Sequence, residues 1–246
     1  MHRYQLLIEY DGTDYFGWQI QKKGKTVQKL IQSTLKKVLG EKIVLVGSGR
    51  TDSGVHAKEQ SAHFETKKII KSKEKIVKSL NYFLNKKLIS ILDLKKKNTN
   101  FHSRYSAKER TYEYIILNRL APPSIDKNKI WHIRKKLDVK IMKKGAKKLI
   151  GLHDFSTFRG SNCYSKSPIR KLKEIKINKK NNKIILKFKS KSFLRNQVRS
   201  MVGCLVLLGK KIWSLNQFEK VFRSKKRALC APPAPPQGLY LSKVVY

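Results

Sequence analysis

The chain has 246 residues, with 57 Lys or Arg against 16 Asp or Glu, so its formal net charge is +41. This length suits one large domain or two packed halves, and the charge favours a polyanion such as nucleic acid; an AT-rich coding bias towards lysine and an anionic membrane surface are the alternatives. Three cysteines without a CxxC motif, a polar N-terminus and a longest apolar run of only residues 201–208 exclude a disulfide framework, a structural zinc site, a signal peptide and a transmembrane helix, so we expect a cytoplasmic protein.

Alternating and helical spacings of apolar residues predict the elements of the first half. In chain order they are a strand at 4–10, a helix at 26–39 between Thr26 as N-cap and Gly40 as C-cap, a buried strand at 43–46, a helix capped by Ser72, and strands at 89–94 and 111–117.

The same spacings of apolar residues predict the elements of the second half. They are a helix capped by Asp138, strands near 171–177 and 184–189, a helix from about 193 to 208, a helix near 214–223 and a closing strand at 239–245. The mixture predicts an α+β fold with a mixed, largely antiparallel sheet and helices packed on one side of it. A break at Ala121-Pro122-Pro123 and a weak echo between the halves predict two related subdomains, residues 1–105 and 106–246.

A glycine-rich loop, residues 47–57, follows the buried strand and reads GSGRTDSGVHA. Two common phosphate loops do not fit it, because a dinucleotide fingerprint needs glycine where Asp52 stands and a P-loop ends in Gly-Lys-Ser/Thr. Since a carboxylate repels phosphate, Asp52 suits chemistry better than phosphate binding. The simpler alternative is a surface turn in which the aspartate caps its own backbone.

The string GRTDSGVHA resembles the catalytic loop of the tRNA pseudouridine synthase A family. Further segments resemble motifs of that family in the same order along the chain. They read YDGTDYFGWQIQ (10–21), TVQKLIQSTL (26–35), FHSRYSAKERTYEYII (101–116), GLHDFSTFRG (151–160), SFLRNQVRSMVG (192–203) and APPAPPQGLYL (231–241).

The resemblance implies the pseudouridine synthase fold, with the active site in a cleft between two related halves. It also implies the reaction, the isomerisation of uridine to pseudouridine at positions 38–40 in the anticodon stem-loop of tRNA. The glycosidic bond breaks, the uracil turns, and the ring rejoins the ribose through carbon. The resemblance implies that no metal or cofactor is needed and that the enzyme is a homodimer.

Four residues match functional positions of the family. Asp52 matches the catalytic aspartate, as nucleophile or base, and Arg50 matches the arginine that fills the gap left by the flipped base. Tyr112 matches the tyrosine whose ring packs on the target uracil, and Arg199 matches the basic partner of the carboxylate. The physics agrees, because burial beside a flipped uracil favours a neutral aspartate and a neighbouring arginine keeps it ionised.

Each assignment has a simpler alternative. Tyr112 lies on a predicted strand in which apolar and polar residues alternate, and the alternative is that it is only a core residue. Arg195 and Arg199 are four residues apart on the same predicted helix, so the alternative for either is a solvated basic face. Arg195 stands where the family usually has histidine, a departure that affects RNA contact more than chemistry. His63 and Glu65 imitate the H-x-E of zinc deaminases, but no PCxxC follows. A basic RNA-binding protein without catalysis explains the charge and leaves GRTDSGVHA unexplained.

Overall fold

The chain folds into two compact units in the computed structural model, which describes residues 1–161 and 163–246. Unit 1 consists of Met1–Lys108 with Tyr240–Tyr246, and unit 2 of Glu109–Leu239. The predicted C-terminal subdomain, residues 106–246, includes the last strand, whereas most of that strand lies in unit 1. The reason is a parallel pairing in which Tyr240 lies opposite His56 and Leu241 opposite Ala57.

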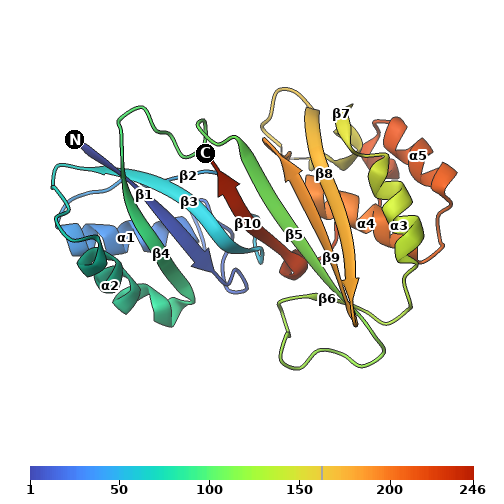
Figure 1. Cartoon of the computed structure of the whole chain (residues 1–246), viewed down its shortest axis with the longest axis horizontal. Helices are drawn as coiled ribbons and strands as arrows, with labels where there is room; N and C mark the ends of the chain where they lie inside the picture. The colour runs from blue at the N-terminus through green and yellow to red at the C-terminus, as the bar shows by residue number, and fades with distance from the viewer. Residues whose placement is uncertain (162) are drawn as a thin grey trace. The chain divides into compact units, whose positions relative to one another are not determined.

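Unit 1 is a sheet with two helices (Figure 1). Its elements are β1 (His2–Tyr10), α1 (Val27–Leu39), β2 (Val46–Gly47), β3 (His56–Thr66), α2 (Lys73–Leu84), β4 (Ile89–Lys97) and the greater part of β10 (Leu239–Val245). The strand order is β4-β1-β3-β10, and β2 pairs with β3. All these pairs are antiparallel except β3 with β10.

Unit 2 carries the remaining strands and helices. They are β5 (Glu109–Asn118), β6 (Trp131–Ile133), α3 (Val139–Lys147), β7 (Gly151–Asp154), β8 (Ile169–Lys180), β9 (Lys183–Ser190), α4 (Gln197–Gly209) and α5 (Leu215–Arg223). The strand order is β5-β9-β8-β7, antiparallel throughout, while β6 pairs parallel with β5. The predicted α+β class with a mixed, largely antiparallel sheet is therefore confirmed.

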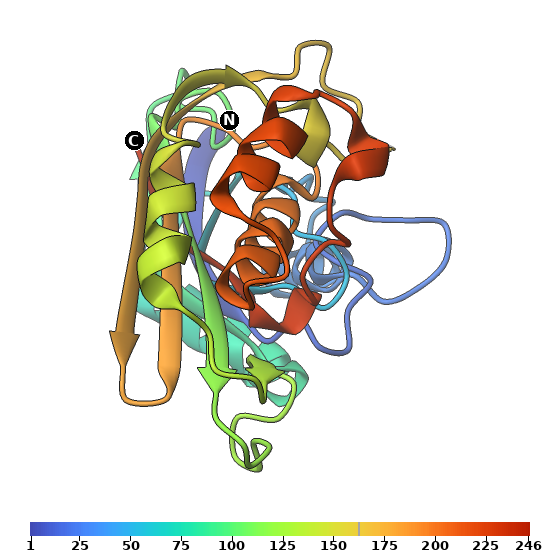
Figure 2. The ribbon, with the colours of Figure 1, turned by 90° about the vertical axis from the view of Figure 1, so that its right-hand side faces the viewer.

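Helix α4 is the centre of the unit 2 core. Its turns Met201–Val206 are buried on every side, which is typical of a helix enclosed by neighbouring elements. α3 packs against β8 and α4, α5 packs against α3 and α4, and Figure 2 shows the helices on one face of the sheet. No helix in the described part of the chain is long and apolar enough to cross a membrane.

Several predicted helix ends are confirmed. The Ser72 hydroxyl accepts from the Lys75 amide and the Asp138 carboxylate accepts from the Ile141 amide, as N-caps do. Gly40 closes α1 in the left-handed conformation, with φ of 72°. Thr26 occupies the N-cap position of α1, but its side chain makes no capping hydrogen bond.

Helix α4 begins later than the predicted residue 193. Asn196 precedes it in the left-handed region, with φ of 60°. The side chain of Gln197 folds back to accept a hydrogen bond of 2.8 Å from the Leu194 amide. This turn separates the preceding loop from the helix, although the apolar spacing continues through both.

Strand β3, His56–Thr66, is not among the elements that the apolar spacing predicts. Its side chains are buried on both faces, including the polar Gln60 and Ser61, so no apolar alternation marks it. The preceding predicted strand at 43–46 is reduced to Val46–Gly47.

Candidate active site

The glycine loop, defined from here as residues 47–55, connects β2 to β3 in unit 1. The side chains of Ser48, Thr51 and Val55 are buried. Arg50 is exposed and Asp52 is half-buried. The loop is therefore fixed to the core through these three buried residues, while Arg50 is exposed to solvent and Asp52 is partly accessible.

The first arm of the loop is held by one buried side chain, Gln60 of β3, which is 0% exposed. Its Oε1 accepts from the Ser48 hydroxyl at 2.8 Å and from the Ser61 amide at 3.1 Å. Its Nε2 donates to the Gly49 carbonyl at 2.9 Å. The Ser48 amide also donates to the Ser61 carbonyl at 2.7 Å, so the backbone before Arg50 is bound to β3 by several hydrogen bonds.

The middle of the loop is held by the motif that follows β1. The Trp18 amide donates to the Thr51 carbonyl at 3.1 Å, and the hydroxyls of Tyr10 and Thr51 lie 2.8 Å apart. Gly17 has φ of +85°, and a Cβ placed there would stand 2.5 Å from the Thr51 carbonyl oxygen. Glycine is required because the two backbones touch beside Asp52.

The second arm is a tight turn. The Val55 amide donates to the Asp52 carbonyl at 3.2 Å, and Gly54 supplies the positive φ, +75°, at the third position of the turn. Gly12 lies against it, since a Cβ there would come within 2.0 Å of the Val55 carbonyl oxygen. The Gly54 amide donates to the Tyr15 carbonyl at 3.3 Å. The loop thus has backbone contacts on both sides of Asp52.

Tyr112 belongs to unit 2, where it stands in β5 opposite Phe188 of β9. Its side chain is 8% exposed, and the edge of its ring meets the ring of Phe193 at a centroid distance of 5.2 Å and an angle of 86°. Tyr114 and Ile116, which follow it at two-residue spacing along β5, are buried as well. A core residue and a stacking platform both fit this position.

Arg199 also belongs to unit 2, in the first turns of α4. Its Nε donates to the Ala234 carbonyl at 2.7 Å, and the Ala234 amide donates to the Arg199 carbonyl at 2.9 Å. Burial raises the pKa of the nearby Tyr114 well above its ordinary value, while the positive charge of Arg199 acts in the opposite direction. The Tyr114 hydroxyl donates to the Pro235 carbonyl at 2.7 Å. Arg195 is exposed.

The residues 231–238, called the proline segment below, hold Arg199 in unit 2. A Cβ on Gly203 of α4 would stand 2.3 Å from the Pro232 carbonyl oxygen, and one on Gly238 would stand 2.6 Å from the Tyr114 ring. The segment therefore lies directly on α4 and on β5, which carry the two predicted site residues of this unit.

Sequence reasoning missed the supporting residues. The segment at 10–21 resembles a family motif, but its residue types assign no role to Gly12, Gly17 or Trp18, and Gln60 belongs to no motif. The signal that would have found them is a run of glycines and aromatics with no place in a regular helix or strand. Contacts between segments distant in the sequence give these residues their roles.

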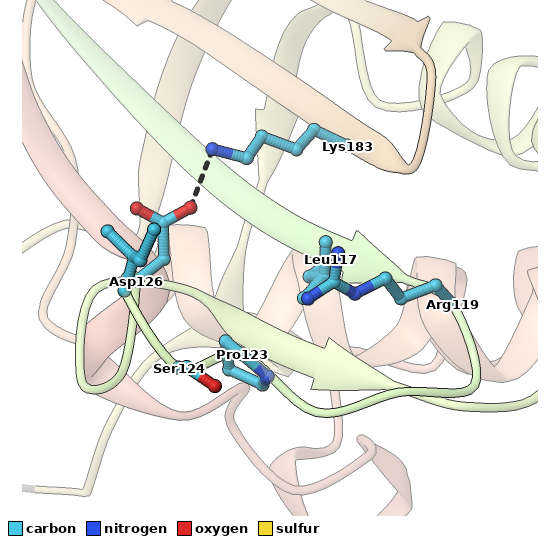
Figure 3. Close-up of a pocket in the computed structure, with 7 residues that line it drawn as sticks. Leu117, Arg119, Pro123, Ser124, Asp126 and Lys183 are labelled. Atoms are coloured by element: carbon cyan, nitrogen blue, oxygen red, sulfur yellow. Dashed lines mark ion pairs between the residues drawn. The ribbon is translucent and has the colours of Figure 1, made fainter.

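Other features of the described residues lie apart from the four predicted positions. No group of three or more His, Cys, Asp or Glu in the described part of the chain is arranged to hold a metal ion. The hollow in Figure 3, of about 220 Å³, belongs to unit 2, and an ion pair of 2.6 Å between Asp126 and Lys183 lines it. The sulfur atoms of Cys204 and Cys230 lie 3.5 Å apart as free thiols.

Comparison with known proteins identifies the family. A family model described as tRNA pseudouridine synthase matches residues 6–106 and 146–246. A protein of Pelagibacter ubique (strain HTCC1062) named tRNA pseudouridine synthase A is 59% identical over 246 residues, covering 100% of both chains. Its namesake in Caulobacter vibrioides (strain NA1000 / CB15N) is 42% identical and covers 100% of this chain and 99% of the relative.

Among solved structures, a chain from "Crystal Structure of a Cbf5-Nop10-Gar1 Complex" aligns with 82% of this chain and 53% of its own length. The TM-score is 0.34 and the identity 12%. The family model and the relatives are sufficient: the chain belongs to the tRNA pseudouridine synthase family and is an isomerase that converts uridine to pseudouridine in tRNA.

Proposed function

We propose that this enzyme modifies uridines 38–40 in the anticodon stem-loop of tRNA, with the carboxylate of Asp52 as its essential catalytic group. The observation that carries the proposal is the arrangement of the glycine loop. Contacts from β3 and from the motif after β1 fix the backbone on both sides of Asp52, while Arg50 is exposed and Asp52 remains partly accessible. A rigid loop that presents a carboxylate suits catalysis, which needs preorganised groups.

The reaction assigns a task to that carboxylate. The bond between the ribose C1′ and uracil N1 breaks, the ring turns, and a bond between C1′ and C5 forms. The proton on C5 is lost and N1 gains one, so no net oxidation or reduction occurs. Asp52 acts as a nucleophile or base on the flipped nucleotide.

The other three residues are proposed to support this step. Arg50 occupies the space that the flipped base vacates, and its exposure on the loop is compatible with entry into an RNA stem. Tyr112 packs its ring on the target uracil, since an aromatic face stacks on any base. Arg199 pairs with the Asp52 carboxylate and keeps it ionised.

A basic RNA-binding protein without catalysis is the competing function. Transfer RNA labelled with tritium at C5 of uridine separates the two, because isomerisation must release that label and binding cannot. We expect release from positions 38–40 in tRNA transcripts and none from transcripts that carry cytidine there. Tight binding without release would refute the proposal, and release from other positions alone would refute the anticodon stem-loop as target.

Location and assembly are proposed from the family resemblance. We expect the enzyme to act in the cytoplasm as a homodimer with one tRNA in contact with both subunits. Sedimentation of the purified protein at micromolar concentration should give the mass of a dimer. A monomer that remains fully active at the same concentration would contradict this part of the proposal.

A further inference from the structure

The buried amide of Gln60 stands in an unusual place for its chemistry. Gln60 lies opposite Ile8 in the pairing of β1 with β3, and its side chain is 0% exposed. An apolar residue would fill this place without any polar group to satisfy, since burial of an amide is favourable only when its hydrogen bonds are made. Gln60 makes them with the glycine loop and with the next residue of its own strand.

The orientation of the amide follows from its partners. The Ser61 amide can only donate and the Gly49 carbonyl can only accept, so Oε1 must face Ser61 and Nε2 must face Gly49. Oε1 accepts two hydrogen bonds, one of them from the Ser48 hydroxyl. A side chain of another shape or polarity would leave at least one of these buried groups without a partner.

The contacts of Gln60 end at the residue before Arg50. Gly49 is bound to Gln60, and on the other side Thr51 is bound to Trp18 and Tyr10. Arg50 is thus a single residue between two fixed points. Because glycine on its N-terminal side has a wide choice of conformations, the hydrogen bond to Gly49 is what restricts the backbone there.

We propose that Gln60 is a positioning residue that acts through Arg50. By binding the Ser48 hydroxyl and the Gly49 carbonyl, it holds the Arg50 guanidinium in the place where it fills the gap left by the flipped uridine. This inference rests on the proposed function, which gives Arg50 that task. Gln60 itself touches neither the tRNA nor the reacting atoms.

The experiment is a double-mutant cycle between Gln60→Met and Arg50→Ala, measured by tritium release in single turnover with saturating enzyme. Methionine matches the length of glutamine and makes no amide hydrogen bonds. With Arg50 present, we expect Gln60→Met to slow the reaction on the order of 10- to 100-fold, as small misplacements do. In the Arg50→Ala background the same change should cost less than about twofold, since coupled residues are not additive.

Gln5→Met is the matched control. Gln5 is another buried glutamine of the same sheet, 4% exposed, and its Nε2 donates to the Ser61 hydroxyl at 2.8 Å. Its described hydrogen bonds do not involve the glycine loop. Gln5→Met should therefore lower the melting temperature as Gln60→Met does, while turnover stays at the parent value. Binding of tRNA should be unchanged in both variants.

A second variant keeps the test valid if Gln60→Met is unfolded at the assay temperature. Gln60→Glu retains both acceptor bonds of Oε1, and its protonated form also donates to the Gly49 carbonyl, whereas its ionised form repels it. We expect its turnover, divided by that of the parent, to fall as pH rises. A ratio that is flat with pH would overturn the proposal.

Additive effects in the cycle, or parent-like turnover of Gln60→Met, would also overturn it. Failure of the proposed function has a different signature. If the parent releases no tritium, the reaction or target is wrong whatever Gln60 does. If the parent is active and Arg50→Ala is as fast as the parent, the role of Arg50 is wrong and Gln60 has nothing to position.

Discussion

The glycine loop of unit 1 and the proline segment of unit 2 are both irregular stretches that lie beside predicted site residues, but their backbones are restrained differently. The glycine loop gains its shape from outside, through Gln60 and through the close contacts at Gly12 and Gly17. The proline segment has restricted φ angles of its own, and it is bound to α4 through both the amide and the carbonyl of Ala234.

This difference teaches which changes each region tolerates. Glycine allows sharp turns but has the largest conformational freedom to lose, so a glycine loop stays in one conformation only while its neighbours hold it. The geometry of Arg50 and Asp52 therefore depends on residues remote in sequence. The geometry of Arg199 depends on a helix with its own hydrogen bonds and on a stiff neighbour.

Among the changes that compare these two regions, the largest loss of turnover is expected at Arg199, which the proline segment contacts. Arg199→Ala should lower turnover on the order of 100-fold, the usual cost of losing a charged group that stabilises a reacting partner, and should leave tRNA affinity near the parent value. Arg195→Ala is the control, because Arg195 is exposed in the loop just before α4. It should weaken tRNA binding and spare single-turnover chemistry. If instead Arg195→Ala lowered turnover and Arg199→Ala only weakened tRNA binding, Arg195 would be the basic partner of the carboxylate.

The next largest effects are expected from alanine substitutions at Gly12 and Gly203, where two backbones lie in close contact. Gly12→Ala would place a methyl group 2.0 Å from the Val55 carbonyl oxygen, and Gly203→Ala would place one 2.3 Å from that of Pro232. Each should cost about 1–3 kcal/mol of unfolding free energy, as overpacking does. We expect Gly12→Ala to lose more turnover, because the glycine loop has fewer restraints of its own. Chemical denaturation with single-turnover assays checks this, and equal losses of turnover would remove the distinction.

Particular residues show which parts of the fold and of the candidate site the sequence predicts. The motifs located Asp52 and Arg50 on one loop, the caps at Ser72 and Asp138 marked real helices, and the alternation at Tyr112 marked a real strand. Local patterns suffice where one face of an element is buried and the other is exposed.

The other features of the fold and of the site could not be predicted from the sequence, because they depend on tertiary contacts. Strand β3 has buried residues on both faces, several of them polar, so it lacks the alternation of apolar and polar residues that predicts a strand. The return of β10 to unit 1 depends on pairing with His56 and Ala57, which are far from it in sequence. The role of Gln60 appears only when Ser48 and Gly49 are brought to it by the fold.

A smaller effect is expected in the pH dependence of the free energy of unfolding, through His63 beside the glycine loop. Burial, with the charges of His102 and Arg3, lowers the pKa of His63 to about 4, and His63 pairs with Val46 at the start of the glycine loop. The unfolded chain, with a histidine pKa of about 6.5, takes up the proton first. Stability from this group is therefore complete above pH 6.5 and is lost as pH falls towards 4.

Urea unfolding between pH 7 and 4 measures this loss. His63→Gln should flatten the dependence. His132→Gln in β6 of unit 2, the matched control, should keep the slope of the parent. An unchanged slope in His63→Gln would show that other groups cause the acid sensitivity.

The smallest effect is expected at Tyr114, which holds the proline segment through one hydroxyl. Tyr114→Phe removes only the hydrogen bond to the Pro235 carbonyl and should cost about 1 kcal/mol. Turnover should fall by less than about threefold, because Ala234 still binds Arg199. Thermal unfolding and single-turnover assays measure both quantities. A loss of turnover as large as that of Arg199→Ala would mean that the proline segment is not stiff.

The central claim is that the glycine loop presents Asp52 as the one essential catalytic carboxylate. Asp52→Asn preserves the size of the side chain and leaves the Asp52 carbonyl free to accept from Val55 as before. The decisive measurement is tritium release from C5-labelled tRNA by purified Asp52→Asn protein, made alongside tRNA binding and thermal unfolding. We predict no release above background, with binding and melting temperature close to those of the parent. Substantial release from this variant would contradict the account.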